Sequence, residues 1–170
     1  MLNQLDEITR EIYHKYRYAL KAIGVKTARQ DVQEAIINCN QGMEAAFQRT
    51  IEYWLYLQET GTNLDYPSAL LIKALEENWV PRHWQKSYLE DPRLKSPCQI
   101  WWEEALEIWG EGVRNSLVAD VSDRDGVDMI FFSSGAKMQL KVAEARGWEA
   151  VLEYAQRSGE NSYANLQDSL

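Results

Sequence analysis

Residues 66–81 begin next to one proline and end at another, and no other stretch of the chain constrains the fold as strongly. Pro67 stands where the first residue of a helix would be, a position at which its missing N–H costs nothing. Leu71, Leu75 and Trp79 then recur every four residues and share one helical face. Because the closing proline cannot continue a helix, the segment predicts a short helix with one buried face.

Three further helices are predicted before this segment. The first carries an apolar stripe at three- and four-residue steps and ends at Gly24, a residue type common just beyond a helix C-terminus. A second, shorter helix follows, and a third runs from about Met43 to Leu55. The apolar positions of the first helix are Leu5, Ile8, Ile12, Tyr16, Ala19 and Ile23.

The second half of the chain changes its periodicity. Residues 99–119 predict a fifth helix, whereas residues 127–140 alternate around a turn that contains Gly135, a pattern typical of a β-hairpin. Residues 142–156 predict a last helix, which Gly147 either interrupts or splits into two. The predicted fold class is mostly α: a compact domain of about five to seven helices with one small β-hairpin near the C-terminus.

Composition predicts four parts along the chain. Residues 1–81 form a helical module, and residues 82–98, which contain prolines and mixed charge, form a linker or loop. Residues 99–157 comprise the acidic helix, the hairpin and the C-terminal helix, which we expect to pack on the first part. The polar residues 158–170 are expected to form a disordered tail. One core is expected to contain Trp54, Leu55, Leu71, Leu75 and Trp109.

The charge and the cysteines narrow the class of protein. The 18 Lys and Arg against 26 Asp and Glu give a net charge of −8, which disfavours nonspecific binding to nucleic acid or membranes. No apolar run approaches the ~20 residues that span a bilayer, so we expect no membrane association. Cys39 and Cys98 are far apart and in no motif, which is typical of reduced thiols in a cytoplasmic protein.

Residues that carry common catalytic chemistry are scarce. Nucleophilic catalysis needs a base near a Ser or Cys, and His14 and His83 are the two histidines of the chain. Residues 120–126 superficially match a calcium loop, but Val121 and Phe132 would then occupy ligand positions that neither can fill. We therefore expect a protein that is not an enzyme, with no catalytic residue, cofactor, bound metal or small-molecule substrate.

Four basic side chains follow one another along the first predicted helix at steps of four, three and four residues. They are Arg10, His14, Arg17 and Lys21, called the basic stripe below. Helical spacing puts them on one face. Such a stripe can follow the phosphates of a nucleic acid, but a solvated helix exterior has the same pattern. Both interpretations stay open from the sequence.

A second candidate surface combines tryptophans with carboxylates. Trp101 and Trp102 are adjacent on a helix and thus about 100° apart, so both cannot face one narrow apolar seam. One of them either covers the linker or is exposed for a partner. The predicted partner surface consists of Trp84, Trp102, Glu103 and Glu107.

Residues 10–81 carry a resemblance to a known family. The pair Gly24-Val25 is followed by a short helix, by a long helix ending near Trp54, and by the run Pro67-Ser-Ala-Leu-Leu-Ile-Lys-Ala-Leu-Glu-Glu-Asn-Trp79. This arrangement resembles a helical module at the ends of bacterial plasmid and phage replication initiators, loosely related to DnaD-type primosome proteins. In that module a Gly-hydrophobic pair opens a helical unit and a Pro-initiated Ala-Leu-Leu-x-Lys-Ala-Leu-x-x-x-Trp helix closes it. The resemblance implies an accessory to a nucleic-acid process.

Together these features predict a non-enzymatic interaction or regulatory module of a bacterial cytoplasm, accessory to replication or another DNA transaction. The alternative is a protein-only adaptor that binds a protein partner through its Trp-lined or acidic surface without touching nucleic acid. A protein partner is expected in either case, whereas the net acidity disfavours DNA. The basic stripe discriminates between the two, since DNA binding should use it.

Overall fold

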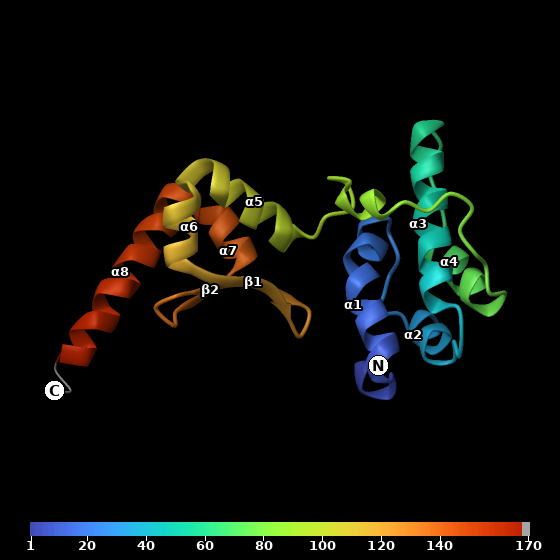
Figure 1. Cartoon of the computed structure of the whole chain (residues 1–170), viewed down its shortest axis with the longest axis horizontal. Helices are drawn as coiled ribbons and strands as arrows, with labels where there is room; N and C mark the ends of the chain where they lie inside the picture. Colours follow the sequence, from blue (N-terminus) through green and yellow to red (C-terminus); the bar gives the residue numbers. More distant parts are fainter. Residues whose placement is uncertain (168–170) are drawn as a thin grey trace. The chain divides into compact units, whose positions relative to one another are not determined.

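The computed structural model describes the backbone of residues 1–167 and the side chains of residues 1–161. It divides into two units, Met1–Ser96 and a second that begins at Pro97, and each unit has its own hydrophobic core (Figure 1). The described residues form eight α-helices, two short 3₁₀ helices and one three-stranded antiparallel sheet. The mostly helical class is therefore confirmed. The single hairpin is corrected to a three-stranded sheet, and the single domain to two units.

The first unit is entirely helical. Its elements are η1 (Leu2–Gln4), α1 (Glu7–Ala22), α2 (Gln30–Ile37), α3 (Met43–Glu59), α4 (Pro67–Glu76) and η2 (Lys86–Glu90). Asp6 caps α1 by accepting a hydrogen bond from the Thr9 backbone N–H at 2.8 Å. Tyr16 of α1 and Phe47 of α3 are fully buried, and their rings lie 5.9 Å apart. Ile8 is 72% exposed, so the buried stripe of α1 turns away from it and runs through Tyr13 and Leu20 instead.

The end of α1 is fastened to the start of α4. Gly24 has φ +100°, and a Cβ at this position would lie 3.0 Å from Cγ of Pro67. Only glycine meets both conditions without strain. The backbone N–H of Lys26 donates to the Ser68 hydroxyl at 2.9 Å. The glycine and the proline that mark the helical module in the sequence thus touch each other in the fold.

Residues 82–96, expected to be a linker, instead belong to the first unit. Leu94 is buried in its core, and Trp84 and Tyr88 pack against that core. Glu52 of α3 is also buried, and its carboxylate accepts the backbone N–H groups of Arg82 at 2.9 Å and of His83 at 2.8 Å. The prolines and mixed charge of this segment predict a loop, but its apolar side chains pack it against the core of the first unit.

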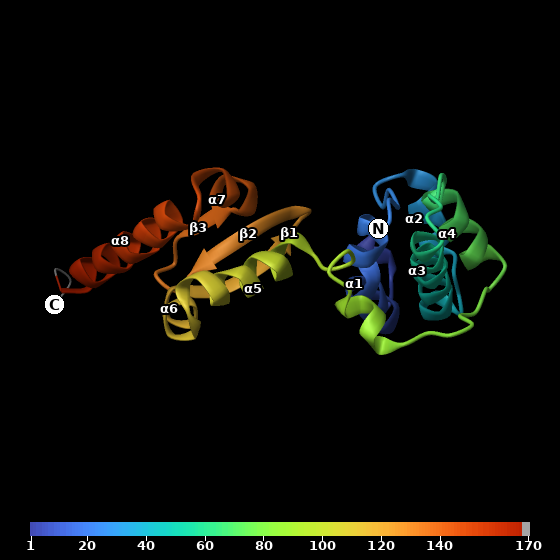
Figure 2. The same ribbon diagram turned by 90° about the horizontal axis from the view of Figure 1, so that it is seen from above.

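The second unit is a small α+β fold. Its elements are α5 (Pro97–Trp109), α6 (Glu111–Leu117), β1 (Val118–Arg124), β2 (Val127–Phe132), β3 (Lys137–Gln139), α7 (Leu140–Arg146) and α8 (Trp148–Gln167). The strands pair in the order β1-β2-β3, and α5 and α7 cover the same face of the sheet (Figures 1 and 2). That face contributes Val118, Ile130, Phe132 and Met138 to the core.

The first strand occupies residues predicted to end a helix and form a polar loop. Gly110, with φ +82°, separates α5 from α6, and the chain leaves the helix at Val118. Asp125 and Gly126 both have positive φ (53° and 84°) and form a two-residue turn between β1 and β2. An Asp-Gly pair between strands is a strong hairpin signal. The polar residues 118–124 form a strand here because they pair with the apolar strand β2.

Near the C-terminus the structure decides between the two alternatives for Gly147 and corrects the expected tail. Gly147, with φ +87°, splits the expected helix into α7 and α8, and α8 continues to Gln167, through most of the segment expected to be a disordered tail. Residues 168–170 of that predicted tail lie outside the described residues. Leu55, Leu71 and Leu75 lie in the first core and Trp54 packs against it, whereas Trp109 packs against the second, because the chain forms two cores.

Candidate functional site

The basic stripe lies on α1, whose regular helix places all four residues on one face. Arg10, His14 and Lys21 are exposed, and Arg17 is half-buried. The Arg10 guanidinium donates to the Leu5 carbonyl at 3.0 Å. The Arg17 guanidinium lies 4.6 Å from the ring centroid of its neighbour Tyr18 and donates to that hydroxyl at 2.9 Å. The face is basic and accessible, but its two arginines are already held by neighbouring groups.

Both tryptophans of the predicted partner surface are partly enclosed. Trp84 lies between Tyr16 and Tyr88, with ring centroids at 6.0 and 5.4 Å. The Arg114 guanidinium covers Trp102 at 3.9 Å from the ring centroid and donates to its carbonyl oxygen at 3.1 Å. Tight packing and this cation–π contact cover part of each indole, and both tryptophans keep an intermediate exposure. The partner surface of Trp84, Trp102, Glu103 and Glu107 stays a prediction.

The outer side of α5 forms another exposed surface. Ile100, Glu104, Glu107 and Ile108, called the α5 outer face below, follow at steps of four, three and one residues and are all exposed. Ile100 is 37% exposed and Ile108 is 53% exposed. Glu103, also exposed, borders them and accepts a hydrogen bond from Gln99 at 3.2 Å. The sequence predicts Glu103 and Glu107 at a partner surface but predicts Ile108 on the inward side, because it follows Trp101 by seven residues, or about two helical turns. The structure corrects this for Ile108, which is 53% exposed.

Charge is divided unequally between the two units. Residues 1–96 contain 12 Lys and Arg against 13 Asp and Glu, a net charge of −1. The remaining residues contain 6 against 13, a net charge of −7. The second unit therefore carries nearly all of the chain's net negative charge, and its electrostatic field favours cationic partners.

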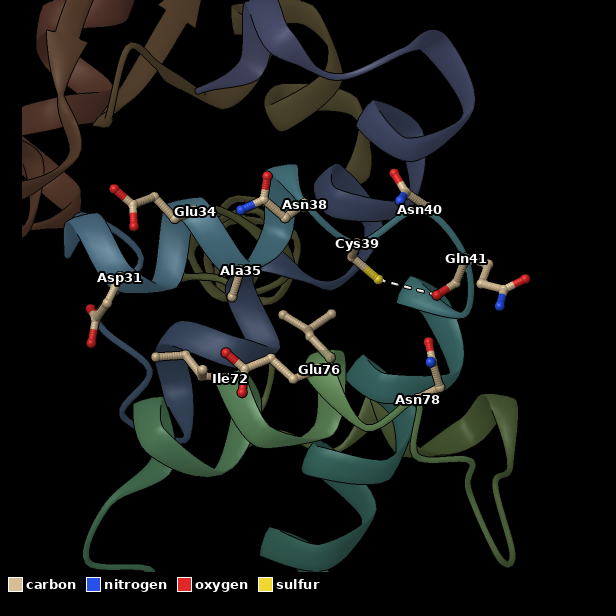
Figure 3. A pocket seen from close by; sticks show the side chains of 11 residues that line it. Asp31, Glu34, Ala35, Asn38, Cys39, Asn40, Gln41, Ile72, Glu76 and Asn78 are labelled. Atoms are coloured by element: carbon tan, nitrogen blue, oxygen red, sulfur yellow. Dashed lines mark hydrogen bonds between the residues drawn. The ribbon is translucent and has the colours of Figure 1, made fainter.

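The first unit has a polar pocket of about 400 Å³ between α2, the α2–α3 loop and the end of α4 (Figure 3). Carboxylates and side-chain amides line it, including those of Asp31, Glu34 and Asn78. The Asp31 carboxylate accepts from Arg29 at 2.6 Å, and this hydrogen bond lowers the pKa of Asp31. The Cys39 thiol at the pocket donates to the Gln41 carbonyl at 3.2 Å (Figure 3). A pocket of this composition disfavours phosphate groups.

Neither cysteine has the properties of a nucleophile. Burial raises the pKa of the Cys39 thiol. Burial, reinforced by the hydrogen bond that the thiol donates to the Asp128 carboxylate at 3.3 Å, raises the pKa of Cys98 to about 12. Both thiols stay protonated at neutral pH, and the thiolate is the reactive form.

A larger concavity of about 510 Å³ lies between α3 and residues 82–93. The buried Glu52 carboxylate sits at its base and receives Arg49 at 3.5 Å in addition to its two backbone donors. Arg93 at the rim is paired with Asp91 at 2.7 Å. Glu52 and Arg93 are thus already paired, and the Glu52 carboxylate anchors the backbone of Arg82 and His83.

The described residues contain neither a cluster of metal ligands nor a helix suited to a membrane. No group of three or more His, Cys, Asp or Glu side chains there is arranged to hold a metal ion. The calcium-like residues 120–126 form a strand and its turn. No helix within residues 1–167 is both long and apolar enough to cross a membrane.

Comparison of the chain with protein-family models, with curated proteins and with solved structures found no match. The function must therefore be argued from the surfaces described above.

Proposed function

We propose that this chain is an interaction module without chemistry of its own, and that its second unit binds a positively charged helical segment of a protein partner. The observation that carries the proposal is the α5 outer face, where two exposed isoleucines flank two carboxylates on a single side of the helix.

The two residue types contribute differently. Carboxylates on a unit of net charge −7 attract a basic partner and orient it, and this attraction weakens as salt screens it. Burial of Ile100 and Ile108 supplies affinity that salt does not remove. A basic amphipathic helix has the complementary pattern, with apolar side chains along one side and Lys or Arg beside them.

The test measures binding of a synthetic amphipathic helical peptide, in which lysines border a row of leucines. The peptide carries a fluorescent label, and its anisotropy is measured as the protein is added. Ile108→Ser should weaken binding roughly tenfold or more, because a full isoleucine contact is worth about 1.5–3 kcal/mol. Glu107→Gln should reduce the salt dependence of binding. The matched control is Ile8→Ser, which alters an isoleucine that is 72% exposed on α1 of the first unit. Equal affinities for the wild type, Ile108→Ser and Ile8→Ser, or no binding to any of them, would contradict the proposal.

A second candidate function is DNA binding by the first unit, in line with the accessory role that the replication-initiator resemblance implies. It is supported by the exposed Arg10, His14 and Lys21 on one face of α1, in a unit whose net charge is −1. The acidity of the second unit opposes it, so affinity should be modest.

For this candidate, labelled duplex DNA is titrated across a salt series. Each neutralised phosphate contributes a log–log slope of about −0.9, so Arg10→Gln with Lys21→Gln should flatten the slope by about two. Lys137→Gln on β3 is the control and should leave the slope unchanged. Absence of binding at low salt would remove DNA from consideration.

A further inference from the structure

A small cavity of about 160 Å³ lies within the second unit between α5, α7 and α8. Trp101 and Trp148 form one wall, Glu104 and Glu144 stand on α5 and α7, and Gly147 lies at the corner between α7 and α8. The cavity has room for the end of one long side chain and is too small for a helix or a nucleotide.

The aromatic wall is rigid. The indoles of Trp101 and Trp148 stack with centroids 5.0 Å apart and an interplanar angle of 20°. Trp109 meets both edge-on, at 5.6 and 5.5 Å. Trp101 is only 4% exposed and belongs to the core, and Trp109 and Trp148 pack against that core. Indole is the aromatic group that attracts cations most strongly, and the same unit uses this chemistry where Arg114 covers Trp102.

Two carboxylates add charge of the matching sign. Glu104 and Glu144 are exposed, and neither makes an ion pair or a hydrogen bond with any other residue of the described part of the chain. A cation entering the cavity would meet both carboxylates and the indoles together. Such a combination favours an ammonium or guanidinium group over a neutral or anionic one.

Gly147 lines the cavity at the corner where α7 meets α8. Its φ of +87° suits glycine, and this conformation sets the corner that brings the two helices to the cavity.

We infer that this cavity receives the cationic head of a lysine or arginine side chain from the protein partner. The inference rests on the proposed function, because Glu104 belongs both to the α5 outer face and to the cavity lining. A basic helix lying along α5 would have the cavity beside it. Insertion of one long basic side chain would then set the register of the partner, and the outer face would supply the rest of the contact.

The test uses three small probes on the intact chain: the Nα-acetyl methylamides of lysine, arginine and norleucine. Indole N–H resonances of Trp101 and Trp148 are followed by NMR. The lysine and arginine probes should shift them saturably, whereas neutral norleucine, which has a similar aliphatic chain, should not. Glu104→Gln with Glu144→Gln should weaken binding of the charged probes about tenfold, since two exposed charge pairs are lost. Glu111→Gln, on α6 and outside the cavity lining, should leave probe binding unchanged.

The outcomes separate this inference from the proposed function. Equal shifts with norleucine, no saturable shift, or no loss in the double variant would overturn the cavity assignment. A fourth probe, n-butylammonium, tests for binding of free amines. If it bound while the lysine probe did not, the cavity would bind a small free amine and not a side chain of a protein, which would also overturn the assignment. Peptide binding that depends on Ile108 but not on Glu104 and Glu144 would leave the α5 outer face standing without the cavity. Saturable binding of the basic probes with no peptide binding would support the cavity chemistry and contradict the helical partner.

Discussion

Replacement of Phe47 by alanine should destabilise the first unit by about 3–5 kcal/mol. Phe47 is fully buried on α3, and its ring packs against Tyr16 of α1 at 5.9 Å. Truncation removes a whole aromatic ring from a closely packed core and leaves a cavity that its neighbours only partly fill. Urea unfolding, monitored by circular dichroism, should show a lower urea midpoint for the unfolding of the first unit.

The control is Ile8→Ala, on the outer side of the neighbouring helix. Ile8 is 72% exposed, so this variant should unfold within about 0.5 kcal/mol of the wild type. Hydrogen exchange resolved by peptide should show the loss of protection in Phe47→Ala concentrated in residues 1–96. A Phe47→Ala variant as stable as Ile8→Ala would show that the core of the first unit is placed incorrectly.

Alkaline pH should destabilise the second unit through Cys98. Burial and the hydrogen bond to Asp128 raise the pKa of Cys98 to about 12, whereas an unfolded thiol titrates near about 8.5. Between these values the native chain holds a proton that the unfolded chain has lost. The stabilisation is fully present below the unfolded pKa and is lost as pH rises toward the folded one, by up to about 1.4 kcal/mol per pH unit.

Denaturant midpoints from pH 8 to pH 10.5, compared between the wild type and Cys98→Ala, measure this effect. The wild type should lose stability more steeply than Cys98→Ala, and the tyrosines and lysines common to both cancel in the difference. Cys39→Ala is the matched control, because Cys39 is only half-buried and should retain most of the wild-type slope. Parallel curves for the wild type and Cys98→Ala would show that Cys98 is not shielded as described.

Particular residues show how far the sequence predicts the candidate site. The steps of four, three and four along Arg10, His14, Arg17 and Lys21 predict one helical face, and α1 has them there. The α5 outer face is less evident from spacing, because Ile108 follows the buried Trp101 by seven residues and yet is exposed. The cavity carries none, because Trp101 and Trp148 are 47 positions apart in the sequence and only the sheet and its helices bring them together. Pairwise contacts between distant segments leave no periodicity for a single sequence to display.

The helices and their ends follow from local chemistry that the sequence displays directly. Apolar spacing predicts α1 to α4, and Gly24 and Pro67 mark where α1 and α4 meet. Periodicity alone predicts one helix across Gly110 and one across Gly147, but the positive φ of each glycine divides it into α5 and α6 and into α7 and α8. What depends on distant partners needed the tertiary structure. The polar residues 118–124 become a strand because they pair with β2. Residues 82–96 join the first unit because Leu94 is buried in its core and Glu52 accepts the N–H groups of Arg82 and His83. The one expected core becomes two. Helical hydrogen bonds close within four residues, whereas sheets and cores are stabilised by groups far along the chain.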